Sequence, residues 1–415
     1  MSSRAGAPVV SQSDRAILRS LAGKVAELAA RPVEDEKRDL WYRHNALEPT
    51  RPVIFCDPEN GWHEIIRPED LQCRDAFARS WEWTLRREIF WGSEMLDDRV
   101  IEPCFSLTHV FSRGDWGMHE TKIGGGDGGA YTWDAPLKSY DDLDKLHFPE
   151  LIIDYDATEA VRELANSVLG DILEVRMRQA WWWSLGMTWI LVNIRGLTQV
   201  MYDMADNPEG LHRLMAILRD GHLAELTFLE ENGLLSLNNR ESYVGSGGFG
   251  WTRELPQEGF DGKARLRDMW GFAESQETVG ISPDMFAEFI FPYQLPVLER
   301  FGLNCYGCCE PLDERWEVVR RFPRLRRVSI SSWSNLDTMA EKLQGNYVFS
   351  MKPNPSDLAW PTFDEEYIRA KLRADIKATR NCRVEIVMKD CHTIGRDPQR
   401  VIRWTRIARE EAESV

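Results

Sequence analysis

Two different spacings of apolar residues alternate along the C-terminal third of the chain. Short, nearly continuous apolar runs of the strand type are each followed by a segment with apolar residues at helical spacing. The runs cover residues 302–307, 326–331, 347–352 and 383–389, and the helical segments cover 311–322, 335–343, 364–379 and 397–412. Strands that alternate with helices in this way predict a parallel sheet.

The first part of the chain contains further strand-like runs at residues 52–56, 99–107, 172–178 and 233–239. Together with the later runs they predict an α/β fold in which eight parallel strands close into a (β/α)8 TIM barrel. An open doubly wound sheet is the alternative, but no Gly-x-Gly-x-x-Gly motif follows the first strand. Helical spacing from Asp14 and again from Asp35 predicts an N-terminal helical extension over residues 1–50, before a barrel domain over 51–415.

The composition argues against several classes of protein. A formal net charge of -16 disfavours nucleic acid and an anionic membrane as the main partner. The sequence has no apolar run of about 18 residues, so no transmembrane helix is expected. Its first residues also lack the layout of a signal peptide. We therefore expect a cytoplasmic protein whose eight cysteines are thiols rather than a disulfide framework.

The strongest chemical signal lies at the ends of two predicted strands. The strand at 302–307 leads into a group of thiols and a carboxyl group: Cys305, Cys308, Cys309 and Glu310. The strand at 383–389 leads into Asp390, Cys391 and His392. Because the carboxyl ends of parallel strands meet at one edge of the sheet, we expect these two ends to converge.

Thiolate and imidazole are the ligands that zinc prefers, which makes Cys308, Cys309 and Cys391 candidate metal ligands. The alternatives are small buried or free thiols, or a nucleophilic cysteine. Adjacent residues of a regular strand point to opposite faces, so at most one of Cys308 and Cys309 is well placed. His392 is a candidate catalytic residue, with a structural hydrogen bond to Asp390 as the alternative.

Other candidate site residues lie near the predicted strand ends. Glu274 precedes a helix start at Ser282–Pro283 and is a candidate general acid or base, or a plain loop residue. The candidate substrate ligands are Asn239, Tyr243, Trp270 and Gln276, of which the two aromatic residues would stack on an aryl ring. The Gly-rich insertion around Tyr243 to Gly250 is a candidate lid over the mouth of the barrel.

Three segments, at residues 282–312, 347–359 and 397–411, resemble the uroporphyrinogen decarboxylase-like superfamily. They contain a Ser-Pro helix start before a strand, a cysteine-bearing strand end and a closing helix after a second cysteine-bearing end. Residues 41–64 look like the branch of corrinoid-dependent methyltransferases that act as O-demethylases. The resemblance is best over residues 234–412.

The resemblance implies a (β/α)8 barrel and, in the methyltransferase branch, a zinc ion held by one His and two Cys. Here the position of that His falls on Asn304 or Tyr306, and Cys391 matches the later cysteine. The implied activity moves a methyl group from a methoxylated, aromatic small molecule to the cobalt of a separate corrinoid protein, which carries the cobalamin. This chain itself has no Asp-x-His-x-x-Gly motif for corrinoid binding.

Two other functions stay open from the sequence. One is a carboxy-lyase of the uroporphyrinogen decarboxylase type, for which Arg176 and Arg178 are too late in the chain to match the family's arginine-rich segment. The other is a barrel that binds a ligand without catalysis. A homodimer is compatible with either of these functions.

Overall fold

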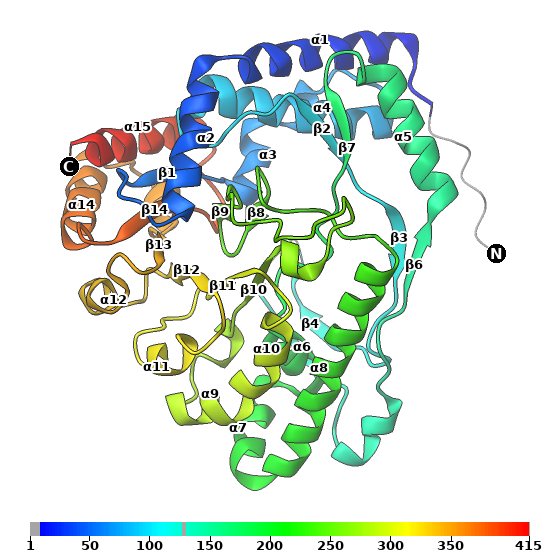
Figure 1. Ribbon diagram of the computed structural model, residues 1–415, viewed down its shortest axis with the longest axis vertical. Helices are drawn as coiled ribbons and strands as arrows, with labels where there is room; N and C mark the ends of the chain where they lie inside the picture. The colour runs from blue at the N-terminus through cyan, green and yellow to red at the C-terminus, as the bar shows by residue number, and fades with distance from the viewer. Residues whose placement is uncertain (1–8, 127–129, 415) are drawn as a thin grey trace.

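The computed structural model describes residues 9–126 and 130–414, which form an α/β fold around a parallel six-stranded sheet (Figure 1). The strands lie in the order β1-β14-β13-β12-β11-β10, and every neighbouring pair is parallel. Their bounds are β1 Val53–Cys56, β10 Trp270–Ala273, β11 Leu303–Tyr306, β12 Leu325–Ile330, β13 Val348–Met351 and β14 Arg383–Met388.

The remaining described strands form pairs. β2 (Cys104–Leu107) and β7 (Glu174–Met177) are parallel. The antiparallel pairs are β3 (Val110–Arg113) with β6 (Leu151–Asp154), β4 (Thr121–Gly124) with β5 (Tyr131–Asp134), and β8 (Tyr243–Val244) with β9 (Gly248–Phe249). Backbone pairing in the described residues thus gives a parallel α/β sheet, and a closed ring of eight strands is not shown.

The four predicted strands of the C-terminal third are confirmed. Every residue of β11 and β13 is buried, as expected for parallel strands with both faces covered. The segments that follow these strands contain α11 (Trp316–Val319), α12 (Leu336–Leu343), α13 (Ser356–Ala359), α14 (Glu365–Ala378) and α15 (Gln399–Glu413). Helix and strand alternate here as the spacing of apolar residues predicts.

Two strand predictions in the first part of the chain need correction. Residues 233–239 form no strand, because the Asn238 side chain takes the place of a backbone ladder. The Trp270 amide donates to Asn238 Oδ1 at 2.8 Å, and Asn238 Nδ2 donates to the Trp270 carbonyl at 2.9 Å. In the predicted run 99–107 only β2 is a strand, and it begins directly after Pro103, which has no amide to donate.

Two helices precede β1, namely α1 (Gln12–Ala29) and α2 (Pro32–Asn45), and α1 lies across α4 (Ala76–Phe90) and beside α5 (Tyr155–Leu169) (Figure 1). The predicted cap at Ser282 is present, since its hydroxyl accepts from the Met285 amide at 3.2 Å. The other helices are α3 Trp62–Ile65, α6 Thr188–Arg195, α7 Leu197–Asp206, α8 Pro208–Glu231, α9 Pro283–Phe289 and α10 Phe291–Leu298.

A buried ion network joins the sheet to α2. Arg327 of β12 and Glu385 of β14 form an ion pair of 3.0 Å, and His44 Nε2 lies 3.3 Å from the same carboxyl group. Burial alone would raise the pKa of Glu385, but Arg327 and His44 outweigh it and lower the pKa to about 2. The Arg327 guanidinium also lies over the Trp270 ring, 5.2 Å from its centroid. The charged pair therefore holds β10, β12, β14 and α2 in fixed register.

None of the helices in the described part of the chain has both the length and the apolar character that crossing a membrane requires.

Candidate functional site

The ends of β11 and β14 meet, as the sequence predicts. Cys309 Sγ donates to Asp390 Oδ2 at 3.7 Å, and it lies 3.5 Å from Cys308 Sγ. Cys308 is buried and Cys309 is exposed, but both lie after the last residue of β11, so strand alternation does not account for the difference. Thiol and carboxyl groups from segments far apart in the sequence therefore share one edge of the sheet.

The Cys308 thiol lies among groups that favour its thiolate form. Ser246 Oγ donates to Cys308 Sγ at 3.2 Å, and Lys389 Nζ lies 3.5 Å from Ser246 Oγ. The hydrogen bond from Cys309 lowers the pKa of Cys308 most, and Lys389 and Ser246 lower it further, against the effect of burial. Lys389 also pairs with Asp390 at 3.0 Å and with Glu59 at 3.6 Å.

The other two predicted residues of this edge point elsewhere. Cys391 is buried in the main hydrophobic core, where its thiol donates to the Lys389 carbonyl at 3.7 Å and burial raises its pKa. His392 is exposed to solvent. Among residues 9–126 and 130–414, no three His, Cys, Asp or Glu side chains are arranged so that they could hold a metal ion. Zinc at Cys308, Cys309 and Cys391 stays a prediction.

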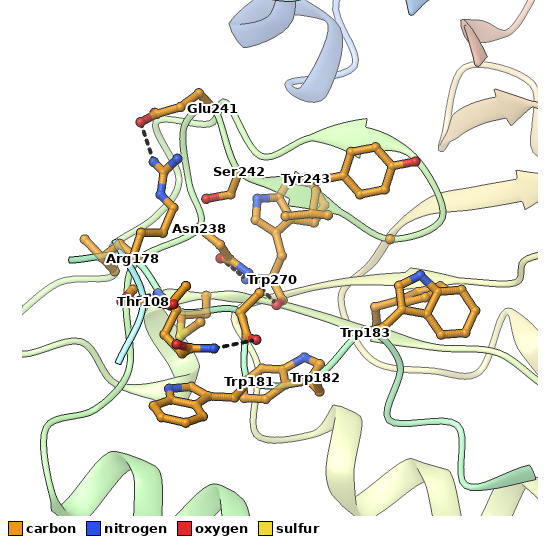
Figure 2. A pocket seen from close by; sticks show the side chains of 18 residues that line it. Thr108, Arg178, Trp181, Trp182, Trp183, Asn238, Glu241, Ser242, Tyr243 and Trp270 are labelled. Carbon is orange, nitrogen blue, oxygen red and sulfur yellow. Dashed lines mark hydrogen bonds and ion pairs between the residues drawn. The ribbon is translucent and has the colours of Figure 1, made fainter. Parts of the chain in front are cut away.

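A cavity of about 530 Å³ lies beside this edge, walled largely by aromatic side chains (Figure 2). Its aromatic wall consists of Trp181, Trp182, Trp183, Tyr243, Trp270 and Phe272. Figure 2 shows Trp181 and Trp182 side by side on one wall, with Trp183 apart from them. Two predicted substrate ligands, Tyr243 and Trp270, thus line a cavity that suits a flat apolar ring.

The polar residues of this cavity are held by partners within the chain. Glu241 accepts hydrogen bonds from Arg176 at 3.0 Å and from Arg178. Asn239, predicted as a substrate ligand, lies outside the cavity wall, because its Nδ2 donates to the Leu255 carbonyl at 2.6 Å. The neighbouring Asn238 lines the cavity instead.

Glu274 and Gln276 line a second cavity of about 380 Å³, which shares Trp181, Trp182 and Trp183 with the first. Glu274 is buried, and its carboxyl oxygens accept from Ser184 Oγ at 3.0 Å and from the Gln276 amide at 2.9 Å. Burial raises the pKa of Glu274 well above its ordinary value, and the nearby carboxyl groups of Glu277 and Glu310 raise it further. The raised pKa favours the protonated form of Glu274, which is the form that can donate a proton.

Glu310 connects the cysteine-bearing end of β11 to the loop that carries Glu274. Its carboxyl oxygens accept from the Ser275 amide at 2.8 Å and from the Cys308 amide at 2.9 Å. Burial raises the pKa of Glu310. The sequence points to Glu310 only through its place after the cysteines, whereas these contacts show that it fixes two strand ends relative to each other.

The Gly-rich segment proposed as a lid packs inward over part of its length. Residues 244–250 are buried, and Ser246 contributes its hydroxyl to the Cys308 environment. Gly248 lies so close to Arg327 that an added Cβ would come within 2.6 Å of the guanidinium carbon, so this position requires glycine. This stretch is thus part of the floor of the site and not a cover over it.

Comparison with known proteins adds no relative to this picture. No model of a protein family matches the chain, and no curated protein matches it. The functional conclusion therefore depends on the motifs of the sequence and on the geometry of the site.

Proposed function

We propose that this protein is a corrinoid-dependent methyltransferase of the uroporphyrinogen decarboxylase-like superfamily, built on a (β/α)8 barrel. It would take a methyl group from a methoxylated aromatic molecule and pass it to the cobalt of a separate corrinoid protein. One observation supports this most: Glu274, a buried carboxyl group with a raised pKa, lies in a cavity that shares three tryptophans with an aromatic-walled cavity beside the ends of parallel strands.

The chemistry explains why such an acid is needed. A methyl ether is a poor electrophile, because an aryloxide is a poor leaving group until its oxygen is protonated or bound to a Lewis acid. The C–O electron pair stays with the oxygen, which takes the proton of Glu274, while the methyl carbon bonds to the electron pair of Co(I) in the second substrate. The products are a phenol and methylated Co(III), and the Glu274 carboxylate regains its proton from solvent. General acid catalysis of this kind typically contributes about 10²- to 10⁴-fold.

The tryptophans have a separate role. Rings of Trp181, Trp182 and Trp270 exclude water from the reacting ether and offer flat faces to the aryl group of the substrate. Trp183 is half exposed, with 51% of its surface accessible, so it lies where the cavity meets solvent. The corrinoid protein would approach from this side.

A zinc ion enters no step of this mechanism. The thiols of Cys308 and Cys309 are suitable zinc ligands, and Asp390 lies 3.7 Å from one of them. The third predicted ligand, Cys391, however, has its thiol on the Lys389 carbonyl and inside the core. The residues present therefore do not fit the predicted three-cysteine site, and elemental analysis of the purified protein decides whether zinc binds.

The experiment that tests the proposal mixes the protein with 4-methoxyphenol and free cob(I)alamin and follows methylcobalamin by absorbance. The wild-type chain is expected to form it, and Glu274→Gln is expected to be slower by about 10²- to 10⁴-fold. No methylcobalamin from the wild-type protein, or an equal rate for Glu274→Gln, would contradict the proposal.

A carboxy-lyase is the second candidate, because cationic side chains line a further cavity next to Tyr243. Arg87, Arg99 and Lys389 all face that cavity. A decarboxylase holds its substrate by carboxylates and needs no methyl acceptor, so release of CO2 from a polycarboxylate without cobalamin would favour this reading over methyl transfer.

A further inference from the structure

A third cavity of about 310 Å³ adjoins the aromatic-walled one and shares Trp183, Glu241 and Tyr243 with it. Trp183 lines all three cavities, so this third chamber, the aromatic-walled cavity and the cavity of Glu274 lie next to one another. The charged lining of the third chamber consists of Asp57, Glu59, Arg87, Arg99, Glu241 and Lys389.

Most of these charges have partners within the chain. Arg99 makes two hydrogen bonds of 2.6 Å to Glu88, and Lys389 pairs with Asp390 and Glu59. Asp57 Oδ1 accepts from the Trp62 indole at 2.8 Å and from a backbone amide. These groups are already satisfied without a ligand.

Arg87 differs from them. Its guanidinium lies over the rings of Trp62, Trp83 and Trp91, at 5.1, 4.6 and 5.0 Å from their centroids. Aromatic faces attract a cation but accept no ordinary hydrogen bond. In the described part of the chain Arg87 Nε is buried without a hydrogen-bond partner, and no carboxylate lies within ion-pair distance of the guanidinium.

An unpaired, partly buried guanidinium such as that of Arg87 destabilises the folded protein unless a ligand supplies a hydrogen-bond acceptor. A guanidinium carries N–H donors in a fixed plane, and a buried donor without an acceptor loses its hydration for no return. Burial accordingly lowers the pKa of Arg87. The cavity beside this side chain is where an acceptor can enter.

We propose that Arg87 binds the carboxylate of the substrate, so that the methyl donor is a methoxylated aromatic acid. The ring would lie in the aromatic-walled cavity, between its tryptophans and Tyr243, with the carboxylate in the third cavity and the methoxy group toward Glu274. The position of the methoxy group rests on the function proposed above, whereas the binding of the carboxylate does not.

A carboxylate fits this chamber better than a phosphate. Asp57, Glu59 and Glu241 already line it, and a dianion would meet their repulsion. Arg87 is the one cation among the described lining residues without an ion pair, so a single negative charge balances it. A planar carboxylate also matches the two parallel N–H groups of a guanidinium edge.

The test is isothermal titration calorimetry with 4-methoxybenzoate and with 4-methoxybenzamide, its neutral counterpart of the same shape. The proteins are wild type, Arg87→Gln and Arg87→Lys, with Arg213→Gln as a matched control that removes an exposed arginine. A charge-assisted pair predicts that wild type and Arg213→Gln bind the benzoate at least about tenfold more tightly than the amide. Arg87→Gln should bind both probes equally.

Thermal melting of the variants provides a second readout. Arg87→Gln is expected to lose the upward shift in melting temperature that the benzoate gives to wild type, whatever effect the loss of the contacts with Trp62, Trp83 and Trp91 has on its melting temperature without ligand. Arg87→Lys keeps the charge without the planar edge, so its preference for the benzoate should fall below that of wild type but not vanish.

The proposal is overturned if wild type does not prefer the benzoate, or if Arg87→Gln keeps the preference. If Arg87→Gln does not fold, the proposal is tested by the preference of wild type for the benzoate over the amide and by the reduction of that preference in Arg87→Lys. Methyl transfer from neutral 4-methoxyphenol without any preference for the benzoate would leave the methyltransferase standing and refute the carboxylate site. Binding of the benzoate through Arg87 without methyl transfer to cobalt would do the reverse.

Discussion

Replacing Glu274 by glutamine tests whether this side chain is a neutral acid in the folded protein. A glutamine amide has the shape of the protonated carboxyl group: its oxygen can accept from the Gln276 amide, and its NH2 can donate to Ser184 Oγ. If Glu274 is neutral, the variant loses no charged interaction, and the free energy of unfolding near neutral pH should not fall by more than about 1 kcal/mol. A charged carboxylate with two donors would instead lose about 3 kcal/mol or more.

The pH dependence gives a sharper measure. The pKa of Glu274 is raised above the ordinary value of 4.5, so the folded wild type holds a proton that the unfolded chain releases as the pH rises beyond that value. The contribution of Glu274 to the free energy of unfolding is largest below about pH 4.5. It declines as the pH rises toward the raised pKa of the folded state. Glutamine lacks this proton, so the stability of the variant relative to wild type should rise with pH above about 4.5, by at most about 1.4 kcal/mol per pH unit, until the pH reaches the raised pKa of the folded state.

The assay is urea unfolding of wild type and Glu274→Gln, followed by circular dichroism at several pH values. Glu258→Gln, at an exposed position, supplies the baseline for loss of one carboxyl group. Parallel stability curves for wild type and Glu274→Gln would show that Glu274 is ionised in the folded protein. The proposed role as a proton donor would then be wrong.

Four further outcomes are expected. Arg327→Met should lower the free energy of unfolding by about 3–5 kcal/mol, because it removes the guanidinium that pairs with the buried Glu385 carboxylate; a loss under about 1 kcal/mol in urea titration would contradict the ion network. Trp183→Ala should leave that energy within about 1 kcal/mol of wild type, since Trp183 is half exposed, yet raise the KM for the methoxylated substrate; an unchanged KM would remove it from the site. His392→Ala should change stability by less than about 0.5 kcal/mol because the ring is exposed, so any loss of methyl transfer would report on chemistry; a large fall in stability would place the ring in a packed contact. Elemental analysis should find the same zinc content in wild type and Cys391→Ala, because that thiol lies in the core; a loss of zinc confined to the variant would make Cys391 a ligand.

The C-terminal strand–helix units are predictable because their strands are buried along most of their length. Runs such as Val348–Met351 have to be apolar to lie between two layers, and that pattern is visible in the sequence. The strand Trp270–Ala273 escapes prediction because it is short and contains Gly271. Residues 233–239 look like a strand, but the Asn238 amide replaces a backbone ladder, and such a tertiary contact leaves no periodic signal.

The candidate site is predictable as a place but not in its details. Parallel topology predicts that β11 and β14 end at the same edge of the sheet, but β12 and β13 lie between them, so it does not by itself predict the contact of Cys309 with Asp390. The directions of Cys391 and His392 depend on Asp390, whose backbone is left-handed with φ of 60°, so that the chain turns as the strand ends. Alternation along a regular strand cannot anticipate this turn, and it leaves Cys391 in the core and His392 in solvent.

Arg87 shows a different limit. It lies in a helix rich in arginine, glutamate and tryptophan, where arginines are most often solvated or paired. Its neighbour Arg86 is such a case, since it pairs with Glu82 at 2.8 Å. Only the folded structure, in which Trp62 and Trp91 pack beside α4, reveals that Arg87 faces three indole rings and a cavity.

The most direct test of methyl transfer follows the methyl carbon itself. A methoxylated benzoate labelled with carbon-13 in its methoxy group is incubated with the protein and cob(I)alamin, and the products are observed by nuclear magnetic resonance. The account predicts that the labelled signal moves from oxygen to cobalt while the free phenol accumulates in equal amount. A label that stays on oxygen while the carboxyl carbon is released as CO2 would contradict it.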